Sequence, residues 1–460
     1  MVWALVFSIC AAEPAAEPAR PAYVGPEAPV AAEPPAPAGF HVMWSPPFDV
    51  RVFGASADGK VDATAAFAAA LEAAGKQGGT VVVPPGQYLI EGSVRVPTGV
   101  TVEGSWTGPH HGAWRQGSTL LLTGGRGKED GPPAIAMQES TVVRGLTIVH
   151  PEQKLEDVQP YPWAIRGYGM HCTVENVTLV NSYNGIAMGP GRNELHLIRN
   201  VFGCVLRCGV LVDGTTDIGR IENVHFNPHY WNRAEYPGTP GTWVYKGEDG
   251  KVETRHPQWY MQEHLDAFVF GRTDWEYVLN TFVFGAKTGY LFTQTREGAA
   301  NGNFLGIGAD WCTTGLKVEA SQPMGILVTN GEFVGHHDCE SAIEVAGNGV
   351  LQLCNSNFWG FQKRNVRLQG PDAFASLNQC IFRDWGPIPE GVPAVEAAGG
   401  TLIVQGCAFM RERVHVALGE HVKSAVIFGN TFTGSPVIRN AAKGDVKIDL
   451  NVAHTPPPRR

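Results

Sequence analysis

The sequence predicts an all-β fold: a single-stranded right-handed parallel β-helix of about ten or more coils, with a capping helix at its N-terminal end. Three observations predict it. A short motif returns at a nearly fixed interval, 56 Gly and 33 Pro in 460 residues indicate many tight turns, and an Ala-rich segment precedes the first predicted strand. Because each coil of a solenoid packs mainly on its neighbours, a chain of this length can form one long domain.

The recurring motif is an Asn, Gln or Gly residue three places before a residue that is apolar in most copies. The copies are Asn176/Leu179, Asn200/Gly203, Asn223/Phe226, Asn280/Val283, Asn330/Phe333, Asn355/Phe358, Gln379/Phe382, Gly406/Phe409 and Gly429/Phe432. Most neighbouring copies lie 23 to 27 residues apart, which suits one coil of three short strands and three turns. A β-sandwich or a propeller would show hairpin turns between antiparallel strands instead.

A helix is predicted ahead of the first coil. Asp62 or Thr64 can cap the N-terminus of an Ala-rich helix that continues to Ala74, and the glycines after it would end the helix. An apolar face with Phe67 and Leu71 would cover the open end of the stack, which would otherwise expose unpaired strand edges.

The segment from Phe48 to Trp106 contains "FDVRVFGASADGKVDAT" and "TVVVPPGQYLI". It resembles the N-terminal pattern of the rhamnogalacturonase/epimerase-like, polygalacturonase-related members of the pectate lyase superfamily. The resemblance implies a pectin lyase-like β-helix that acts on carbohydrate. In the polygalacturonase-like branch the catalytic carboxylates lie in an Asp-Asp motif before an apolar run, and Asp266-Ala-Phe-Val-Phe270 is similar to a single-Asp version. This sequence has no Asp-Asp, Gly-His-Gly or Arg-Ile-Lys, so the known hydrolytic machinery of that branch is not carried over.

The ends of the chain are predicted to lie outside the β-helix. Residues 1–19 contain an apolar run that predicts a signal peptide and a secreted or periplasmic protein, with Cys10 as a lipid-anchored cysteine as the alternative. Residues 20–45 are rich in Ala, Glu and Pro and predict a disordered linker. The β-helix domain is then 46–452, and 453–460 form a C-terminal tail. No later stretch is apolar for long enough to predict a membrane span.

An aromatic insertion, residues 227–265, interrupts the repeat. It lies in a gap of 57 residues between two copies of the motif, which is about two coils, and loops of such length are usually functional. Trp231, Trp243, Trp259 and Tyr260 are its candidates for stacking against sugar rings. The alternative is that the same rings pack the insertion onto the solenoid.

A second set of strands aligns on one Gly per coil, at Gly185, Gly209, Gly289 and Gly315, and Asp266 is predicted to take that place in one coil. Alternation along a strand then points Ala267 and Val269 into the core. The places two residues before the Gly are predicted to form an exposed column at about 4.8 Å spacing. Its members are Tyr183, Arg207, His264, Lys287 and Thr313.

This column predicts the catalytic centre. Asp266, His264 and Lys287 are the candidate catalytic residues, and Arg207 and Tyr183 are candidates for substrate binding. A His between two cations stays neutral and can accept a proton, while the cations can hold the carboxylate of an acidic sugar. The alternative is a row of solvated charges on the wall of the solenoid.

An inverting hydrolase needs a second carboxyl about 6.5 to 9.5 Å from the first. Asp213 is predicted to lie about 14 Å from Asp266, which is too far. Glu263, Asp217, Asp274 and Asp249 remain as possible partners, each of which could equally form a turn or a solvated surface.

Other features limit the range of partners. The net charge of -9 without a run of Lys or Arg argues against nucleic acid. The cysteines after Cys10, among them Cys380 and Cys407 in one register, predict buried free thiols, with a disulfide as the alternative. His336-His337-Asp338 lacks further ligands nearby in sequence, so no metal site and no cofactor are predicted, although Ca²⁺ held by several coils is an alternative.

Two hypotheses follow. The first is a carbohydrate-active enzyme, a glycoside hydrolase or polysaccharide lyase, that cleaves glycosidic bonds of a pectin-like or other uronate-containing polysaccharide in a groove on the β-helix wall. The second is a non-catalytic glycan-binding or cell-surface structural β-helix protein. The sugar, the linkage and the oligomeric state are not indicated by the sequence.

Overall fold

The computed structural model describes residues 47–110, 112, 115–240, 256–386 and 391–454. These residues belong to one compact unit. The predicted signal peptide and linker, Trp243 and Asp249 lie outside the described residues. None of the helices in the described ranges is long and apolar enough to cross a membrane.

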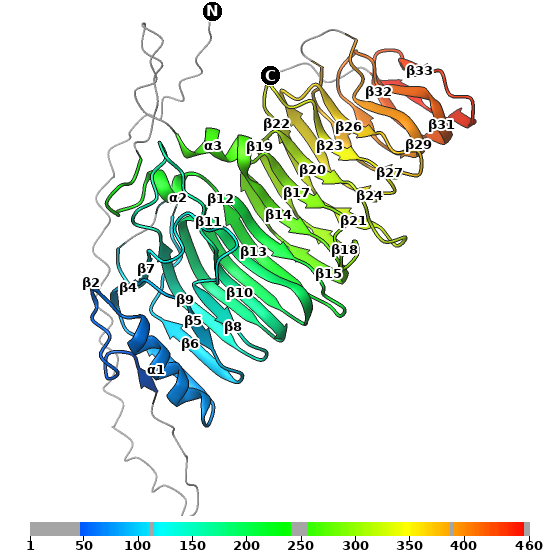
Figure 1. Ribbon diagram of the computed structural model, residues 1–460. Helices are drawn as coiled ribbons and strands as arrows, with labels where there is room; N and C mark the ends of the chain where they lie inside the picture. The colour runs from blue at the N-terminus through cyan, green and yellow to red at the C-terminus, as the bar shows by residue number, and fades with distance from the viewer. Residues whose placement is uncertain (1–46, 111, 113–114, 241–255, 387–390, 455–460) are drawn as a thin grey trace, which may run out of the picture. The chain divides into compact units, whose positions relative to one another are not determined.

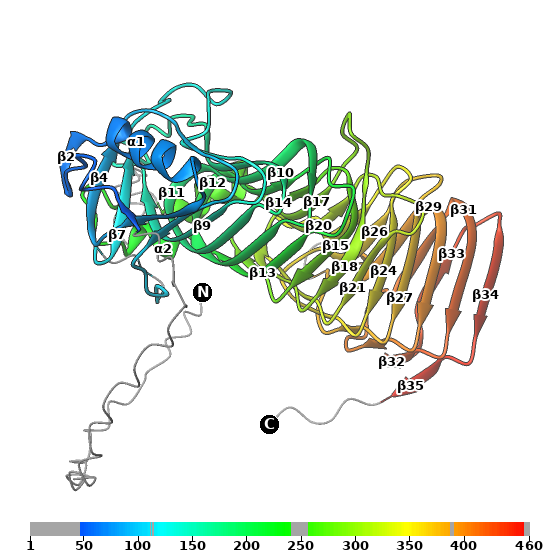
Figure 2. The ribbon, with the colours of Figure 1, turned by 90° about the horizontal axis from the view of Figure 1, so that it is seen from below.

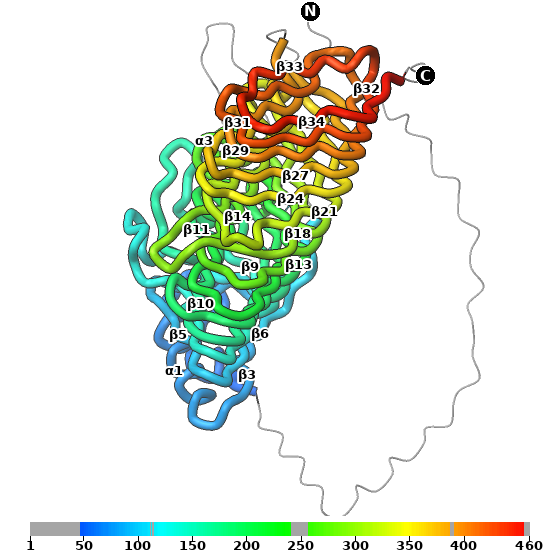
Figure 3. The backbone as a smooth tube through the Cα atoms, turned by 90° about the vertical axis from the view of Figure 1, so that its right-hand side faces the viewer, coloured from blue at the N-terminus to red at the C-terminus, as the bar shows by residue number. Residues whose placement is uncertain are grey.

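The chain winds as a parallel β-solenoid, which confirms the predicted fold (Figure 1). All paired strands within the named ladders are parallel, and the same side of each coil meets the same side of the next. Figures 2 and 3 show the coils following one another from blue to red. The strands form three walls, which we name A, B and C in the order in which the chain passes through them.

Wall A is the first ladder. Its strands are β1 (Phe48–Asp49), β3 (Gly79–Val83), β6 (Val100–Gly104), the first parts of β9 (Val142–Val149), β11 (Thr173–Glu194), β12 (Leu197–Val212) and β13 (Arg220–Phe226), then β15 (Thr273–Leu279), β18 (Ala300–Leu305), β21 (Ile326–Thr329), β24 (Val350–Cys354), β27 (Phe374–Asn378), the later parts of β29 (Val395–Gln405) and β31 (Val416–Phe428), and β34 (Asp445–Asp449). One register column runs through Phe48, Val81, Val102, Val143, Val174, Ile198, Ile221, Val278, Phe304, Val328, Leu353, Leu377, Val404, Ile427 and Ile448. These fifteen rungs agree with the expectation of ten or more coils.

Wall B follows the Asn position of each coil. Its strands are β2 (Asp58–Asp62), β4 (Gly86–Ile90), β7 (Ser118–Leu122), the later parts of β9, β11, β12 and β13, then β16 (Phe282–Phe284), β19 (Gly308–Cys312), β22 (Glu332–Gly335), β25 (Asn357–Gly360), β28 (Ile381–Phe382), β30 (Ala408–Phe409), β32 (Thr431–Thr433) and β35 (Val452–His454).

Wall C closes each coil. Its strands are β5 (Val94–Val96), β8 (Ile135–Met137), β10 (Trp163–Met170), the last parts of β11 and β12, β14 (Asp266–Phe270), β17 (Thr288–Phe292), β20 (Thr314–Val318), β23 (Ser341–Val345), β26 (Arg364–Leu368), the first parts of β29 and β31, and β33 (Ile438–Asn440).

The recurring motif is the corner between walls A and B. Its first residue has a left-handed backbone in every copy, for example φ 52° at Asn223 and 66° at Gly429, which Asn and Gly tolerate best. The Asn amides also bond from coil to coil, since Asn223 donates to Asn200 at 2.8 Å. Three residues later the side chain points inward, and Phe358, Phe382 and Phe409 stack with centroids 5.0 and 4.6 Å apart. The motif therefore sets both the turn and the core.

The Ala-rich segment forms helix α1 (Thr64–Gly75), as predicted, but its N-cap residue is Ala63 and not Asp62 or Thr64. Asp62 accepts hydrogen bonds from the backbone N–H and the hydroxyl of Thr64, at 2.9 and 2.5 Å. Phe67 and Leu71 are buried, and the helix contacts β1, β3, β5 and β6. Its role as a cap of the open end remains a prediction.

The eight described cysteines are free, and Cys380 and Cys407 are buried, which confirms the expectation of core thiols.

Candidate functional site

The predicted register of the column on wall C is wrong by one residue in the coil that contains Asp266. Asp266 pairs with Cys208 and Thr288, so Ala267, and not Asp266, lies beside Gly209. Phe268 and Phe270 point into the core in place of Ala267 and Val269. The reason is packing: Phe268 stacks on Tyr290 at 4.8 Å and Phe270 on Phe292 at 5.1 Å, which buries more apolar area than Ala and Val could.

This one-residue change removes His264 from the column. His264 is the last residue of helix α3 (Pro257–His264), and its side chain is about half exposed. Lys287 is exposed on the next coil, and its backbone N–H donates to Met261. The predicted arrangement of His264 between Arg207 and Lys287 is therefore not formed, because the insertion ends in a helix and not in a strand.

Part of the predicted centre is nevertheless assembled. The Arg207 guanidinium contacts Asp266 at 3.2 Å, and the Asp266 side chain is 11% exposed. The other Asp266 oxygen, Oδ1, is buried without a hydrogen-bond partner among the described residues. The sequence reasoning did not find Glu129, which accepts a hydrogen bond from Asn184 at 3.3 Å.

Two tyrosines belong to the same group. Burial raises the pKa of Tyr260 to about 12, and Tyr183, Arg207 and Glu129 are near enough to act on it. Burial and then Glu129 also raise the pKa of Tyr183. Both hydroxyls are therefore neutral near pH 7. Tyr183 is only 9% exposed, which differs from the exposed position predicted for it in the column. Its role in substrate binding stays a prediction.

The aromatic rings of the insertion divide into two kinds. Trp231, in helix α2 (His229–Asn232), is 2% exposed, so its predicted role in stacking on substrate is wrong and it packs the insertion onto the solenoid. Tyr236 is also buried and its hydroxyl bonds to Thr119 at 3.0 Å. Trp259 is 47% exposed and keeps an open face.

The His336-His337-Asp338 segment has local partners. His336 lies 3.1 Å from the Thr313 hydroxyl and accepts a hydrogen bond from the backbone N–H of Asp338. The His337 ring packs on Phe361 at 4.4 Å. Within the described ranges no group of three or more His, Cys, Asp or Glu side chains is arranged to hold a metal ion.

A groove lined by carboxyl groups and aromatic rings lies on the outer face of wall B. It consists of two adjoining hollows of about 900 and 560 Å³ that share Asp310, Val334, Trp359 and Arg383. Because Ala309, Phe333 and Phe358 point inward, the residues on either side of them point outward. Register then gives two outward columns. One is Phe282, Gly308, Glu332, Asn357 and Ile381, and the other is Phe284, Asp310, Val334, Trp359 and Arg383.

The groove contains two carboxyl groups on adjacent coils. Asp310 pairs in register with Val334, and Glu332 lies two residues before Val334. One strand spacing and two residue rises separate the backbone positions of Asp310 and Glu332 by about 8 Å. Side chains that leave the same wall at this offset can bring their carboxyl groups to the separation that an inverting glycosidase requires, about 6.5 to 9.5 Å.

The two carboxyl groups lie in different environments. Burial raises the pKa of Asp310 to about 6, against a smaller lowering by the backbone N–H of Trp311. Glu332 is exposed, and its two oxygens accept hydrogen bonds from Asn357 at 3.0 Å and from the Trp359 indole at 3.2 Å. Hydrogen bonds of this kind orient a carboxylate and leave lone pairs free. Asp310 is suited to donate a proton, and Glu332 to accept one.

Aromatic rings line the groove beside these carboxyl groups. The Trp359 ring is 47% exposed and its orientation is fixed by the hydrogen bond to Glu332. Trp311 packs against Phe361 at 5.9 Å, and Phe361 is 44% exposed. Arg383 is exposed, and no ion pair is formed by its guanidinium within the described ranges. The groove thus contains exposed aromatic rings, the carboxyl groups of Asp310 and Glu332, and the Arg383 guanidinium.

Two helices of the insertion contact residues of this groove. Gln262 of α3 donates to the backbone carbonyl of Trp311 at 3.0 Å. The ring of His229 in α2 stacks over Phe284 with centroids 6.5 Å apart. The two helices therefore fix the end of the groove where Asp310 lies.

A sequence signal for this site was present. The dipeptide Asp-Trp occurs at Asp274-Trp275, Asp310-Trp311 and Asp384-Trp385. In the first two copies the Trp backbone is left-handed, with φ 58° and 56°. Between Asn280 and Asn330 the motif spacing also fits Gly306 as a further copy. The inward residue of that copy is Ala309, which shares a register position with Phe333, and Asp310 follows it.

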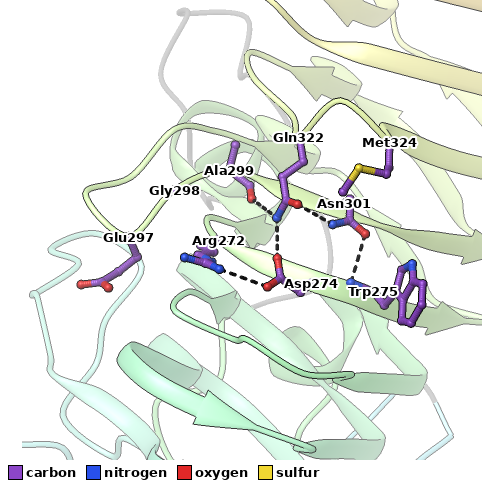
Figure 4. A pocket seen from close by; sticks show the side chains of 9 residues that line it. All are labelled: Arg272, Asp274, Trp275, Glu297, Gly298, Ala299, Asn301, Gln322 and Met324. Carbon is purple, nitrogen blue, oxygen red and sulfur yellow. Dashed lines mark hydrogen bonds and ion pairs between the residues drawn. The ribbon is translucent and has the colours of Figure 1, made fainter.

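A further pocket of about 490 Å³, on a different side of the coils, is lined by Arg272, Asp274, Trp275, Asn301, Gln322 and Met324 among others (Figure 4). Asp274 accepts hydrogen bonds from Arg272 at 3.1 Å and from Gln322 at 2.6 Å. Each of its oxygens therefore has a hydrogen-bond partner in this pocket. The pairing of Asp274 with Asp266 stays a prediction.

Comparisons with known proteins agree with the fold. Residues 48–145 match the sequence model of the family described as rhamnogalacturonase A/epimerase, pectate lyase-like. No curated protein sequence matches the chain significantly. Among solved structures, the DFA-IIIase of Arthrobacter chlorophenolicus A6 in complex with DFA-III is similar, with a TM-score of 0.53 and 11% identity over 84% of this chain and 94% of that chain.

The pre-mature gene product 12 of bacteriophage phi29 is also similar, with a TM-score of 0.51 and 11% identity over 88% of this chain and 56% of that chain. At such identities these likenesses show the fold alone. The chain is therefore a parallel β-helix protein whose residues 48–145 have the sequence pattern of the rhamnogalacturonase A/epimerase, pectate lyase-like family, as the N-terminal resemblance predicted.

Proposed function

We propose that the protein is a glycoside hydrolase that cleaves a polysaccharide in the groove of wall B. The observation that carries the proposal is the pair Asp310 and Glu332, offset by about 8 Å in an aromatic groove, with burial raising the pKa of Asp310 to about 6. One carboxyl group is thus partly protonated near neutral pH while the other is held by two hydrogen bonds.

The reaction follows from these positions. Asp310 donates its proton to the glycosidic oxygen as the bond from that oxygen to the anomeric carbon breaks. A water molecule on the Glu332 side attacks the anomeric carbon and gives its proton to Glu332. The configuration at the anomeric carbon is inverted, and proton exchange with solvent restores both carboxyl groups.

The substrate class is supported by the surroundings of the pair. Exposed faces of Trp359 and Phe361 can stack on sugar rings, and the Arg383 guanidinium can hold a sugar carboxylate. These features favour a pectin-like or other uronate-containing glycan. The family match and the similarity to a DFA-IIIase structure are consistent with carbohydrate as the substrate.

The second candidate is β-elimination at Arg207 and Asp266 on wall C. The observation that favours it is the buried Asp266 oxygen without a partner beside the Arg207 guanidinium, which could neutralise a uronate. The third is glycan binding without catalysis, as the sequence allowed.

One experiment separates these functions. The purified protein is incubated with polygalacturonate, rhamnogalacturonan, alginate and xylan, and reducing ends, the ultraviolet absorbance of unsaturated uronates and the anomeric proton signals of fresh product are followed. We expect reducing ends of inverted configuration without an absorbance rise, and loss of product in both Asp310→Asn and Glu332→Gln. A rise in absorbance, or full activity of both variants, would contradict hydrolysis in this groove.

A further inference from the structure

The pocket of Figure 4 lies apart from both carboxyl groups of the groove and is built by three successive coils. Trp275 comes from β15, Asn301 from β18, and Gln322 and Met324 from the loop before β21. The pocket therefore follows the stacking direction of the solenoid, as a bound polymer would.

Trp275 occupies an unusual position for a large apolar residue. Its side chain is 61% exposed, and its backbone is left-handed with φ 58°. A bulge between Thr273 and Glu276 in the pairing of β15 with β18 turns it outward. Both the exposure and the backbone conformation oppose stability, so an observed outlier of this kind is a basis for a functional hypothesis.

The surroundings hold this conformation in place. The Trp275 backbone N–H donates to the Asn301 side chain at 3.1 Å, and the Asn301 amide donates to Gln322 at 2.8 Å. Gln322 in turn donates to the Ala299 carbonyl at 2.9 Å and to Asp274 at 2.6 Å. Figure 4 shows this network as a polar floor, with the Trp275 ring at one side and Met324 above Asn301.

The chemistry of the pocket matches that of a sugar unit. A pyranose has one apolar face, which stacks on an indole ring, and hydroxyl groups around its edge, which bond to amides, carboxylates and guanidinium groups. Trp275 offers the ring, and Glu297 and Arg272 offer partly exposed polar groups at the rim.

We infer that this pocket is a second, non-catalytic sugar-binding site that holds a distant part of the same polysaccharide chain. The identity of the glycan in this inference rests on the proposed function. The binding experiment below does not depend on that function. Because the network fixes the pocket before binding, little conformational entropy is lost when a sugar enters. The site would increase the time that a polymer stays on the enzyme without changing the bond-breaking step.

Affinity electrophoresis in gels that contain polygalacturonate, rhamnogalacturonan, alginate or xylan tests this inference. The native protein should be retarded in at least one gel, and Trp275→Ala should bind that polysaccharide roughly tenfold more weakly. Phe428→Ala, which removes another exposed aromatic ring of wall A, is the matched control and should behave as the native protein. Asp310→Asn should be retarded fully, which separates retention from catalysis.

The outcomes that overturn the inference are distinct from those that overturn the hydrolysis. Equal retardation of Trp275→Ala and the native protein in every gel, or no retardation of the native protein in any gel, would overturn the sugar site even if product is formed. A change from dimer to monomer in Trp275→Ala on sedimentation, with unchanged retention, would show that the ring contacts a second copy instead.

Discussion

Replacing Asp310 with Asn removes a carboxyl group whose pKa burial raises from 3.8 to about 6, and this should change how stability depends on pH. A difference of about two pH units corresponds to about 3 kcal/mol. Because the carboxyl group is partly exposed to solvent, screening reduces this to about 1–2 kcal/mol.

The sign of the effect follows from the direction of the pKa change. A raised pKa means that the folded protein favours the protonated form, so Asp310 contributes its stabilisation fully below about pH 4 and loses it as the pH rises through about 6. Asn cannot ionise and has no such dependence. Relative to Asp310→Asn, the native protein should therefore lose about 1–2 kcal/mol of unfolding free energy between about pH 4 and pH 7.

Guanidinium unfolding followed by tryptophan fluorescence at several pH values measures this difference. Asp130→Asn, the same substitution at an exposed position, is the matched control. A constant difference for Asp310→Asn, or a native protein that gains stability relative to it as the pH rises, would refute the proposed burial of the Asp310 carboxyl group.

Substitutions at three further positions test the fold by the same unfolding measurement. Phe382→Ala removes a ring from the inward stack and should lower the free energy of unfolding by about 3–5 kcal/mol. Phe382→Leu should lower it by less than about 1.5 kcal/mol, and equal losses in the two variants would contradict the stack. Glu276→Ala leaves the fully buried His196 without its 3.0 Å partner and should cost about 3 kcal/mol, and a cost below about 1 kcal/mol would show that the pair is not buried. Asn223→Ala should cost about 2 kcal/mol, since Ala opposes the left-handed backbone and lacks the amide, while Asn223→Gly should cost about half as much; the opposite order would contradict the assigned backbone.

The coil repeat could be predicted because it is local in sequence. Most copies of the motif place an Asn or Gly where the backbone is left-handed and an apolar residue where the side chain points inward, so both signals recur at the same spacing. The helix before the first coil was predictable for the same reason, from an Ala-rich run between residues that favour helix ends.

The register around Asp266 could not be predicted, because it is decided by packing between coils. In Asp266–Phe270 either of two alternating sets of side chains could face the core. The stack of Phe268 on Tyr290 selects the set that places Ala267 beside Gly209. The sequence alone does not show which rings meet across coils. The same limit applied to Trp231, whose burial depends on how the insertion folds back onto the solenoid.

The acid pair of wall B was missed for a related reason. Asp310 pairs with Val334 on the next coil, and Glu332 lies two residues before Val334, so the two acids are close only because the coils stack. The motif alignment did not include Gly306, so the wall B strand that carries Asp310 was not placed, although Gly315 of the same coil was.

The central claim is that the chemistry takes place on wall B and not on wall C. It is tested most directly by the rate of reducing-end release from the cleaved polysaccharide by two isosteric variants, Asp310→Asn and Asp266→Asn, with circular dichroism confirming that each is folded. The account predicts at least a roughly hundredfold loss in Asp310→Asn and a rate within about threefold of the native protein in Asp266→Asn. An inactive Asp266→Asn beside an active Asp310→Asn would contradict it and would move the reaction to the Arg207–Asp266 pair.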